Sequence, residues 1–251
     1  MRIDFPAQEQ VPQLKALWEL AFGDSRAVID AFFSMAYAPE RCRCVTMDGQ
    51  AAAALYWFDT ECGGQKLAYL YAVATHPAYR HRGLCRALIG DTHALLAGLG
   101  YEGALLMPAQ EGLRRMYGAM GYRDCCNVSV FDCAAGVPVP LKKVSTGEFA
   151  RLRREFLPRG GVIQEGETLN YLATYAAFYA GTDFLLAASA GDGQLWGMEL
   201  LGNRDAAPGI LGALGYPRGT FRTPGTGIPF AMFRPLKPGA MAPAYFGLEL
   251  N

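Results

Sequence analysis

The residues of this chain that are best suited to chemistry lie in a short basic turn at positions 80–86. In order they are Arg80, His81, Arg82, Gly83, Leu84, Cys85 and Arg86. An apolar and aromatic run at 67–74 precedes the turn, and leucines at helical spacing follow it to position 99. The first N–H groups of a helix have no intrahelical partner, and the helix dipole adds partial positive charge there. Glycine permits close approach of an anion and the arginines add full charges, so this turn predicts a phosphate or pyrophosphate cradle.

The spacing of the turn is more specific than that of a general phosphate loop. It resembles the Arg/Gln-x-x-Gly-x-Gly/Ala turn of the GCN5-related N-acetyltransferase (GNAT) family, with Arg80, Gly83 and Cys85 at the matching positions. Cys85 departs from the family's Gly or Ala but is also small. The segment 73–77 resembles the end of the family's fourth strand, and 117–122 resembles its Tyr-x-x-x-Gly-Phe/Tyr ending. The resemblance covers about residues 1–135, and the alternative is a surface turn that binds nothing.

The resemblance implies roles for these residues. Residues 80–86 would hold the pyrophosphate of acetyl-coenzyme A, which is a cosubstrate, and no metal is expected. The backbone of Val73, Ala74 and Thr75 would pair with the pantetheine amides and polarise the thioester oxygen. Tyr117 matches the tyrosine that protonates the leaving thiolate, and the alternative is a buried structural tyrosine. Arg114 and Arg115 are interpreted as a solvated basic face, and His93 as structural.

The general base is not identified by the sequence. Many relatives carry a glutamate on the central strand, but residues 66–75 include no Asp or Glu and contain Tyr69 and Tyr71 instead. Water can relay the proton away from the amine. Alternatively a carboxylate from elsewhere serves, including the chain terminus at Asn251, as in the enhanced-intracellular-survival acetyltransferases that this chain also resembles.

The composition restricts the classes of partner. The chain has 23 basic and 23 acidic residues, and this balance argues against a nucleic-acid binder that acts through bulk charge. There is no signal-peptide core and no apolar stretch long enough to span a membrane. The seven cysteines lack the spacing of a zinc site. We therefore expect a cytoplasmic protein with reduced thiols, without nucleic-acid, membrane or metal partners. A homo-oligomer is compatible with these features.

The first half of the chain predicts an α/β fold with a mixed sheet. Asp48-Gly49 between two apolar runs indicates a tight hairpin. Phe32, Phe33 and Tyr37 either line an acceptor pocket or belong to the core, and helical spacing favours the core. The expected helices are 11–22, 26–37, 84–99 and 111–120, and the expected strands are 41–47, 51–59, 67–74, 104–107 and 125–132.

The second half repeats part of the first. A helix at 168–180, a strand at 184–188, Asp192-Gly193-Gln194 and a strand at 195–201 match the order seen at 26–59. Residues 212–216 resemble 118–122 and are expected at the end of another short helix. Further strands are expected at 229–233 and 245–250. No room remains between 201 and 213 for a second cradle. We therefore predict a tandem GNAT-like acyl-CoA N-acyltransferase fold, with a GNAT domain at 1–136 that holds the coenzyme and a degenerate GNAT-like domain at 137–251, joined by a linker at 134–140.

Taken together, these patterns predict an acetyl-CoA-dependent N-acetyltransferase that acts by direct transfer to a primary amine. The acceptor is a small molecule or a peptide. The alternative is a non-catalytic acyl-CoA-binding sensor or scaffold, which the missing strand glutamate favours.

Overall fold

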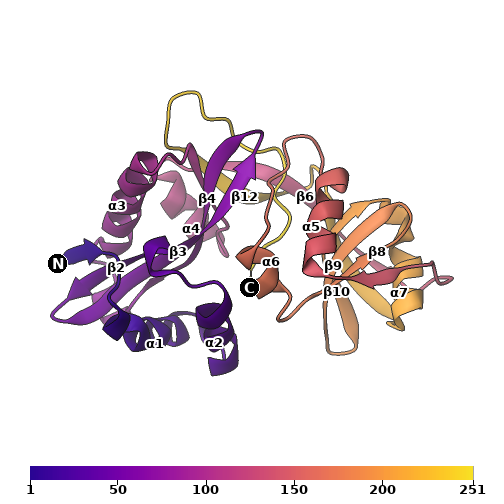
Figure 1. Cartoon of the computed structure of the whole chain (residues 1–251), viewed down its shortest axis with the longest axis horizontal. Helices are drawn as coiled ribbons and strands as arrows, with labels where there is room; N and C mark the ends of the chain where they lie inside the picture. Colours follow the sequence, from indigo (N-terminus) through magenta and orange to yellow (C-terminus); the bar gives the residue numbers. More distant parts are fainter. Residues whose placement is uncertain (251) are drawn as a thin grey trace. The chain divides into compact units, whose positions relative to one another are not determined.

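The computed structural model describes residues 1–250, which form two compact units (Figure 1). The first unit comprises residues 1–60, 64–123 and 233–242. The second comprises residues 61–63, 124–232 and those from 243 onward. Each unit consists of β-strands and helices that pack on them.

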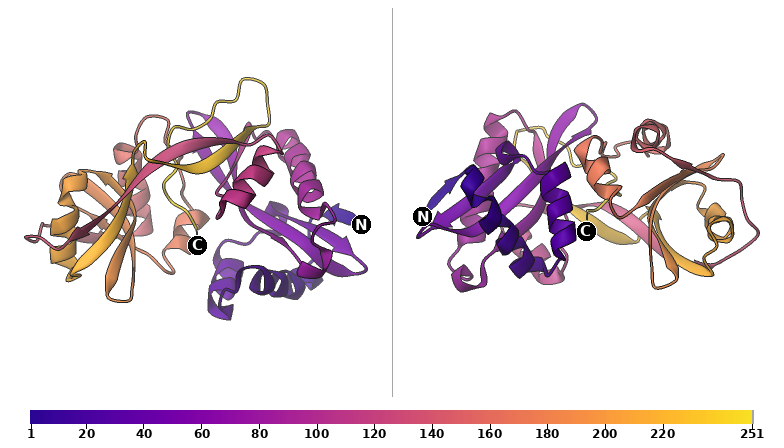
Figure 2. Two further views of the ribbon diagram at one scale, coloured as in Figure 1. Left: turned by 180° about the vertical axis from the view of Figure 1, so that it is seen from behind. Right: turned by 60° about the horizontal axis from the view of Figure 1, so that its bottom comes forward.

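The first unit is a mixed sheet with helices on both faces. Helices α1 and α2 cover one face, and α3 and α4 cover the other (Figure 1 and Figure 2). The strands lie in chain order, and β4 and β5 run parallel. The strands are β1 (Arg2–Asp4), β2 (Cys42–Met47), β3 (Gln50–Cys62), β4 (Gln65–Thr75) and β5 (Gly103–Leu106). The helices are α1 (Val11–Phe22), α2 (Arg26–Met35), α3 (Leu84–Gly98) and α4 (Glu111–Gly118), with 3-10 turns η1 (Gln8–Gln10), η2 (Pro39–Arg41) and η3 (Pro77–Tyr79).

Local signals explain where these elements begin and end. Gly23 ends α1 with φ 75°, and the Ser25 hydroxyl caps α2 by accepting from the Val28 N–H. Asp48 and Gly49 both have positive φ, which confirms the predicted hairpin between β2 and β3. Trp18 from α1 packs on Phe32 from α2 with ring centroids 4.7 Å apart. Phe32 is fully buried, so its prediction as a core residue is confirmed.

In the second unit the strands follow one another in the order β6-β11-β10-β9-β8-β7. Strands β10 and β11 run parallel, and β6 pairs antiparallel with β11. The strands are β6 (Arg123–Ala134), β7 (Lys142–Val144), β8 (Ala177–Ala180), β9 (Phe184–Gly191), β10 (Gln194–Gly202), β11 (Arg218–Pro224) and β12 (Ile228–Pro235). The helices are α5 (Thr146–Phe156), α6 (Glu167–Leu172) and α7 (Ala207–Leu214), with the 3-10 turn η4 (Arg204–Ala206).

The two units repeat one order of elements. The first runs β1-α1-α2-β2-β3-β4-α3-β5, and the second runs β7-α5-α6-β8-β9-β10-α7-β11. In each, the last two strands of the series are parallel neighbours. The predicted tandem fold is therefore confirmed. The link from β10 to α7 is short, and α7 has 8 residues where α3 has 15.

The correspondence that we predicted between residues 168–201 and residues 26–59 is wrong by one strand. A helix over 168–180 was expected, but α6 ends at Leu172 and Ala177–Ala180 form strand β8. The four residues of β8 alternate between half-buried and buried, which is the period of a strand. Asp192-Gly193 therefore joins the counterparts of β3 and β4, not those of β2 and β3. Strands β9 and β10 and helix α7 were predicted correctly, whereas α5 and β11 were not predicted.

Strands β6 and β12 each contact residues that are distant in the sequence. Strand β6 follows α4, yet it pairs with β11 from Val128 to Ala134. The end of β12 lies in the first unit, where the Phe233 ring packs against Gly103 of β5. The compact units thus change near Arg123 rather than at the linker around residue 136. Our assignment of 1–136 and 137–251 as an active and a degenerate domain remains a prediction.

The C-terminal segment enters the core of the second unit without forming the strand predicted at 245–250. Only Tyr245 makes a β-bridge, with Gly161. Tyr245, Phe246 and Leu248 are nevertheless buried, and the Gln164 amide donates to the Leu248 carbonyl at 2.7 Å. The segment is held by tertiary contacts instead of a strand ladder.

A buried ion pair lies beneath this segment. Arg153 binds Glu199 through two hydrogen bonds of 2.7 and 2.8 Å, and the Tyr245 hydroxyl donates to the same carboxylate at 3.0 Å. Both charged side chains are almost inaccessible, at 2% and 0% exposure. Arg153 and Tyr245 therefore stabilise the ionised form of the buried Glu199 carboxylate.

We expect Arg153→Ala to lower the free energy of unfolding by about 3–5 kcal/mol, because it leaves the Glu199 carboxylate buried without its counterion. Urea denaturation followed by circular dichroism measures this change. Arg151→Ala is the matched control on α5, since Arg151 and Glu155 form an exposed i,i+4 pair. The control should cost less than about 0.5 kcal/mol. Equal losses in the two variants would contradict the importance of the buried pair.

Candidate active site

The candidate site is organised around the open end of β4. The parallel ladder between β4 and β5 ends at the pair Tyr69 and Leu105, while β4 continues to Thr75. Ala72 has φ 47°, a left-handed conformation that is uncommon for alanine and that interrupts the regular strand. Strands β4 and β5 are therefore no longer paired beyond Tyr69. The left-handed conformation of Ala72 was not predicted from the sequence, because alanine carries no signal for positive φ.

The predicted residues Val73, Ala74 and Thr75 lie on this diverging end of β4. Ala74 is buried, and Val73 and Thr75 are half-buried. On the β3 side the next residue, His76, donates its N–H to the Ala52 carbonyl at 2.9 Å. One edge of this segment is thus held to β3 by a hydrogen bond. Its other edge extends past the last residue that pairs with β5.

The basic turn forms the expected link from β4 to α3. The Arg80 guanidinium donates to the Thr75 carbonyl at 3.3 Å, so it braces the end of β4. His81 and Gly83 have φ of 61° and 75°, and both are exposed. His76 caps η3 by accepting from the Ala78 N–H through its Nδ1 atom. The strand–turn–helix arrangement predicted from the sequence is present.

The N-terminus of α3 carries no side-chain cap. Gly83 is the N-cap residue, and the first intrahelical bond runs from the Ala87 N–H to the Gly83 carbonyl at 3.0 Å. The N–H groups of Leu84, Cys85 and Arg86 precede that bond and have no partner within the helix. Together with Arg82 and Arg86, these N–H groups can hold an anion.

Tyr117 lies on α4 close to this end of α3. It is buried, and its ring meets that of Tyr122 edge to face, with centroids 5.8 Å apart. Burial, and to a smaller extent the neighbouring Cys85 thiol, raises the pKa of Tyr117. Burial also raises the pKa of Cys85 to about 11. Both groups therefore keep their protons at neutral pH, and Tyr117 is in the form that can donate one.

A polar contact joins α3 to the segment behind Tyr117. His93 Nε2 and the Tyr122 hydroxyl are 2.7 Å apart, and both side chains are buried. Arg234, at the end of β12, donates to the Met120 carbonyl at the end of this helical segment. These contacts confirm the prediction that His93 is structural, and they support the position of Tyr117. The residues are far apart in the sequence, so no local pattern identifies the contact.

We expect the stability of the protein to fall as the pH decreases from 6.5 towards 4. Burial, with a smaller effect of Arg234, lowers the pKa of His93 to about 4. Between these pH values the unfolded chain binds a proton that the folded protein does not, so acidification favours unfolding. The expected loss is up to about 3 kcal/mol, since one pKa unit corresponds to about 1.4 kcal/mol.

Thermal unfolding across this pH range measures the effect. His93→Phe should make the melting temperature less dependent on pH, and His81→Asn in the exposed turn should keep the wild-type dependence. An unchanged slope in the His93 variant would show that another group causes the acid sensitivity.

A cavity of about 480 Å³ lies between α1 and α2. Phe33 and Tyr37 line it, together with Lys15 and Asp30, which form an ion pair of 2.6 Å. The Tyr37 hydroxyl is buried and makes no hydrogen bond within residues 1–250. Of the three aromatic residues considered from the sequence, Phe33 and Tyr37 thus line a cavity, whereas Phe32 belongs to the core.

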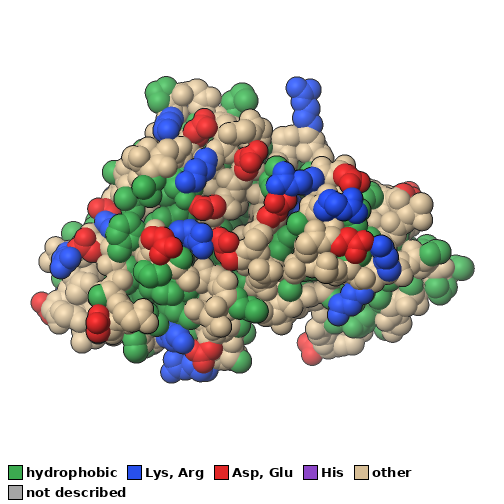
Figure 3. Space-filling model, viewed as in Figure 1, with side chains coloured by type: hydrophobic (Ala, Val, Ile, Leu, Met, Phe, Trp, Pro, Cys, Tyr) green, Lys and Arg blue, Asp and Glu red, His purple; other side chains and the backbone are tan. Residues whose placement is uncertain are grey.

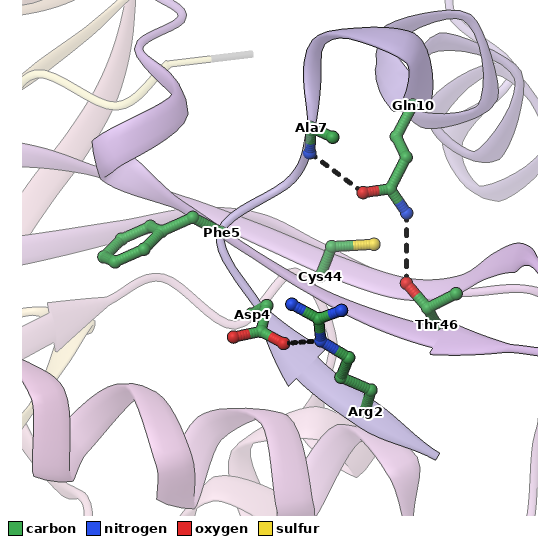
Figure 4. Close-up of a pocket in the computed structure, with 7 residues that line it drawn as sticks. All are labelled: Arg2, Asp4, Phe5, Ala7, Gln10, Cys44 and Thr46. Atoms are coloured by element: carbon green, nitrogen blue, oxygen red, sulfur yellow. Dashed lines mark hydrogen bonds and ion pairs between the residues drawn. The ribbon is translucent and has the colours of Figure 1, made fainter.

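A second cavity, of about 260 Å³, lies beside β1 and β2 (Figure 4). Gln10 crosses it, accepting from the Ala7 N–H and donating to the Thr46 hydroxyl. Cys44 also lines this cavity. Its side chain is buried, and burial raises the pKa of the Cys44 thiol to about 11. A protonated thiol is a poor nucleophile.

The surface of the protein carries charged side chains of both signs. On the face drawn in Figure 3, basic and acidic side chains are interspersed.

No group of three or more potential metal ligands occurs within the described residues, 1–250. In the same range, no helix has the length and apolar character needed to cross a membrane. Asn251, whose terminal carboxylate is one of the two alternatives for the base, lies outside the described residues.

Comparison with known proteins agrees with this geometry. Residues 2–124 match the family model described as an acetyltransferase (GNAT) domain. No curated protein matches the sequence.

Several solved structures share the fold at low sequence identity. A GCN5-related N-acetyltransferase from Anabaena variabilis has a TM-score of 0.74 at 16% identity, over 94% of this chain and 73% of that one. One from Kribbella flavida has a TM-score of 0.70 at 17% identity, over 94% and 72%. Eis1 from Mycobacterium abscessus has a TM-score of 0.68 at 13% identity, over 94% and 74%. The likeness extends over both compact units of the chain.

Proposed function

This chain belongs to the GNAT acetyltransferase family through its residues 2–124, and we propose that it transfers an acetyl group from acetyl-CoA directly to a primary amine. The proposal rests on one observation, the position of the uncapped N-terminus of α3 directly after the unpaired end of β4. The strand leaves its parallel neighbour after Tyr69, and the chain then turns into the uncapped N-terminus of α3.

The residues at this place fit the coenzyme. The N–H groups at the start of α3, with Arg82 and Arg86, suit a diphosphate. Gly83 is exposed, and a Cβ atom there would meet nothing within 4 Å, so the turn is open to a ligand. The diverging part of β4, Val73 to Thr75, offers backbone groups to the amides of an extended pantetheine chain. When bound, acetyl-CoA supplies the activated acyl group.

The protein groups then have separate tasks. A backbone N–H of the diverging segment polarises the thioester oxygen and stabilises the charge that develops on it. As the amine nitrogen bonds to the carbonyl carbon, the carbon–sulfur bond breaks and Tyr117 protonates the leaving sulfur. The amine loses its proton to water or to a carboxylate. Residues 66–75 of the central strand contain no Asp or Glu, which favours water or a group from another segment.

The cavity between α1 and α2 is our candidate for part of the acceptor site. Its walls combine the half-buried rings of Phe33 and Tyr37 with the Lys15–Asp30 pair. This combination suits an amine that carries an apolar or aromatic portion. The acceptor is thus proposed to be a small molecule or the end of a peptide.

Thiol release from acetyl-CoA in the presence of a panel of amines tests the function. The panel should include polyamines, aminoglycosides, aromatic amines, amino acids and peptides with a free N-terminus or lysine. Amine-dependent release, with the acetylated product confirmed by mass spectrometry, is the expected result. Calorimetric binding of coenzyme A without turnover of any amine would favour the alternative, a non-catalytic acyl-CoA sensor.

A further inference from the structure

Two adjacent cysteines near the start of β6 lie in direct contact. The Sγ atoms of Cys125 and Cys126 are 3.3 Å apart. In a regular strand, successive side chains point to opposite faces, so neighbouring cysteines do not touch. Here Cys126 has φ 60°, a left-handed conformation, and this turn of the backbone brings both thiols to the same side.

The conformation of Cys126 is unfavourable by itself. A residue other than glycine in the left-handed region costs on the order of 1 kcal/mol or more. It persists because the surroundings hold it: Cys126 is buried and its thiol donates to the Pro243 carbonyl at 3.4 Å. The ladder with β11 begins at Val128, so the strained position precedes that regular pairing. The surrounding contacts therefore hold Cys126 in the conformation that keeps the two thiols together.

The two thiols differ in their access to solvent. Cys125 is half-buried, and Cys126 is buried. The hydrogen bond with Cys125, together with burial, raises the pKa of Cys126. An external reagent therefore reaches Cys125 first, and Cys126 stays in place as a second, protonated thiol.

We propose that Cys125 and Cys126 form a reversible vicinal disulfide and are an oxidative modification site of this protein. With a peroxide as the oxidant, the Cys125 sulfur attacks the O–O bond and becomes a sulfenic acid, while the peroxide is reduced to water. The Cys126 sulfur then displaces the sulfenic oxygen as a second water and the S–S bond forms. Two thiols and one peroxide thus give one disulfide and two waters. A dithiol reductant restores both thiols by exchange.

The disulfide would also alter the start of the C-terminal segment. The S–H group of Cys126 is consumed, so its hydrogen bond to the Pro243 carbonyl is lost. Ala244 and Tyr245, which follow, both donate their N–H groups to the Gly160 carbonyl. Oxidation should therefore increase amide hydrogen exchange in residues 243–245.

A third thiol makes the pairing testable. Cys62 lies in the same unit, donates to the Gly160 carbonyl at 3.3 Å and contributes to the raised pKa of Cys126. A disulfide between Cys62 and Cys126 is therefore the competing product, and peptide mapping distinguishes it from the vicinal one.

The experiment uses the full chain, reduced and then exposed to hydrogen peroxide, with N-ethylmaleimide to block the remaining thiols. The expected product has lost two hydrogen atoms on a single peptide that contains Cys125 and Cys126, and dithiothreitol reverses the change. Cys125→Ser and Cys126→Ser should each prevent it. Cys133→Ser, on the same strand, should leave it intact.

Phenylarsine oxide gives a second measurement that needs no variant, because one trivalent arsenic atom bridges two adjacent thiols. It should protect Cys125 and Cys126 together from alkylation. Separate alkylation of both cysteines after peroxide treatment, or a cross-link to Cys62, would overturn the proposal. Neither readout depends on acetyltransferase activity.

Discussion

Gly83→Glu is expected to abolish measurable binding of coenzyme A, with a loss of affinity of about 100-fold or more. Two effects act together. Gly83 has φ 75°, where a residue with a Cβ atom costs about 1–2 kcal/mol. In addition, the new carboxylate lies at the N-terminus of α3, where the proposed cradle must hold an anion of the same sign. Isothermal titration calorimetry with coenzyme A measures the change.

Two further variants separate charge from conformation. Gly83→Ala introduces only the conformational cost and should weaken binding by about 10-fold, since about 1.4 kcal/mol corresponds to a factor of ten. Gly98→Glu places the same charge at the other end of α3, where a Cβ atom meets nothing within 4 Å. It should bind coenzyme A as the wild type does. If Gly83→Glu also bound normally, the coenzyme site would lie elsewhere.

Tyr117→Phe is expected to lower kcat by about 100-fold or more, which is the usual contribution of a general acid. The phenol is buried beside Cys85, and its raised pKa keeps it protonated through the neutral and mildly alkaline range. Phenylalanine preserves the ring contact with Tyr122 and removes only the proton donor. The KM for acetyl-CoA should therefore change little. Steady-state kinetics with a saturating amine measure both constants.

The pH dependence of kcat in the wild type is a further measurement. Below pH 10 the titration of Tyr117 itself should not reduce kcat, because burial raises its pKa above the ordinary value of 10.0. Tyr216→Phe, which changes a tyrosine packed on the core of the second unit, is the matched control and should retain full activity. An unchanged kcat in Tyr117→Phe would leave this tyrosine as a structural residue.

The central strand–turn–helix and much of the tandem plan could be predicted from the sequence, because their signals are local. The turn at 80–86 is contiguous, and its glycine with positive φ and its uncapped helix start are consequences of local chemistry. The hairpin at Asp48-Gly49 and the caps at Gly23 and Ser25 are likewise decided within a few residues. Such signals can be recognised without knowing what the segment packs against.

Other features of the fold depend on contacts between residues that are distant in the sequence. Residues 177–180 form a strand because β9 pairs with them, although the aromatic spacing before them is compatible with a helix. The exchange of β6 and β12 between the units depends on pairing across about a hundred residues, and no local pattern encodes it. The same applies to the opening of β4 at Ala72, the His93–Tyr122 contact and the paired thiols of Cys125 and Cys126. In each case long-range packing imposes a geometry that the local sequence alone does not prefer.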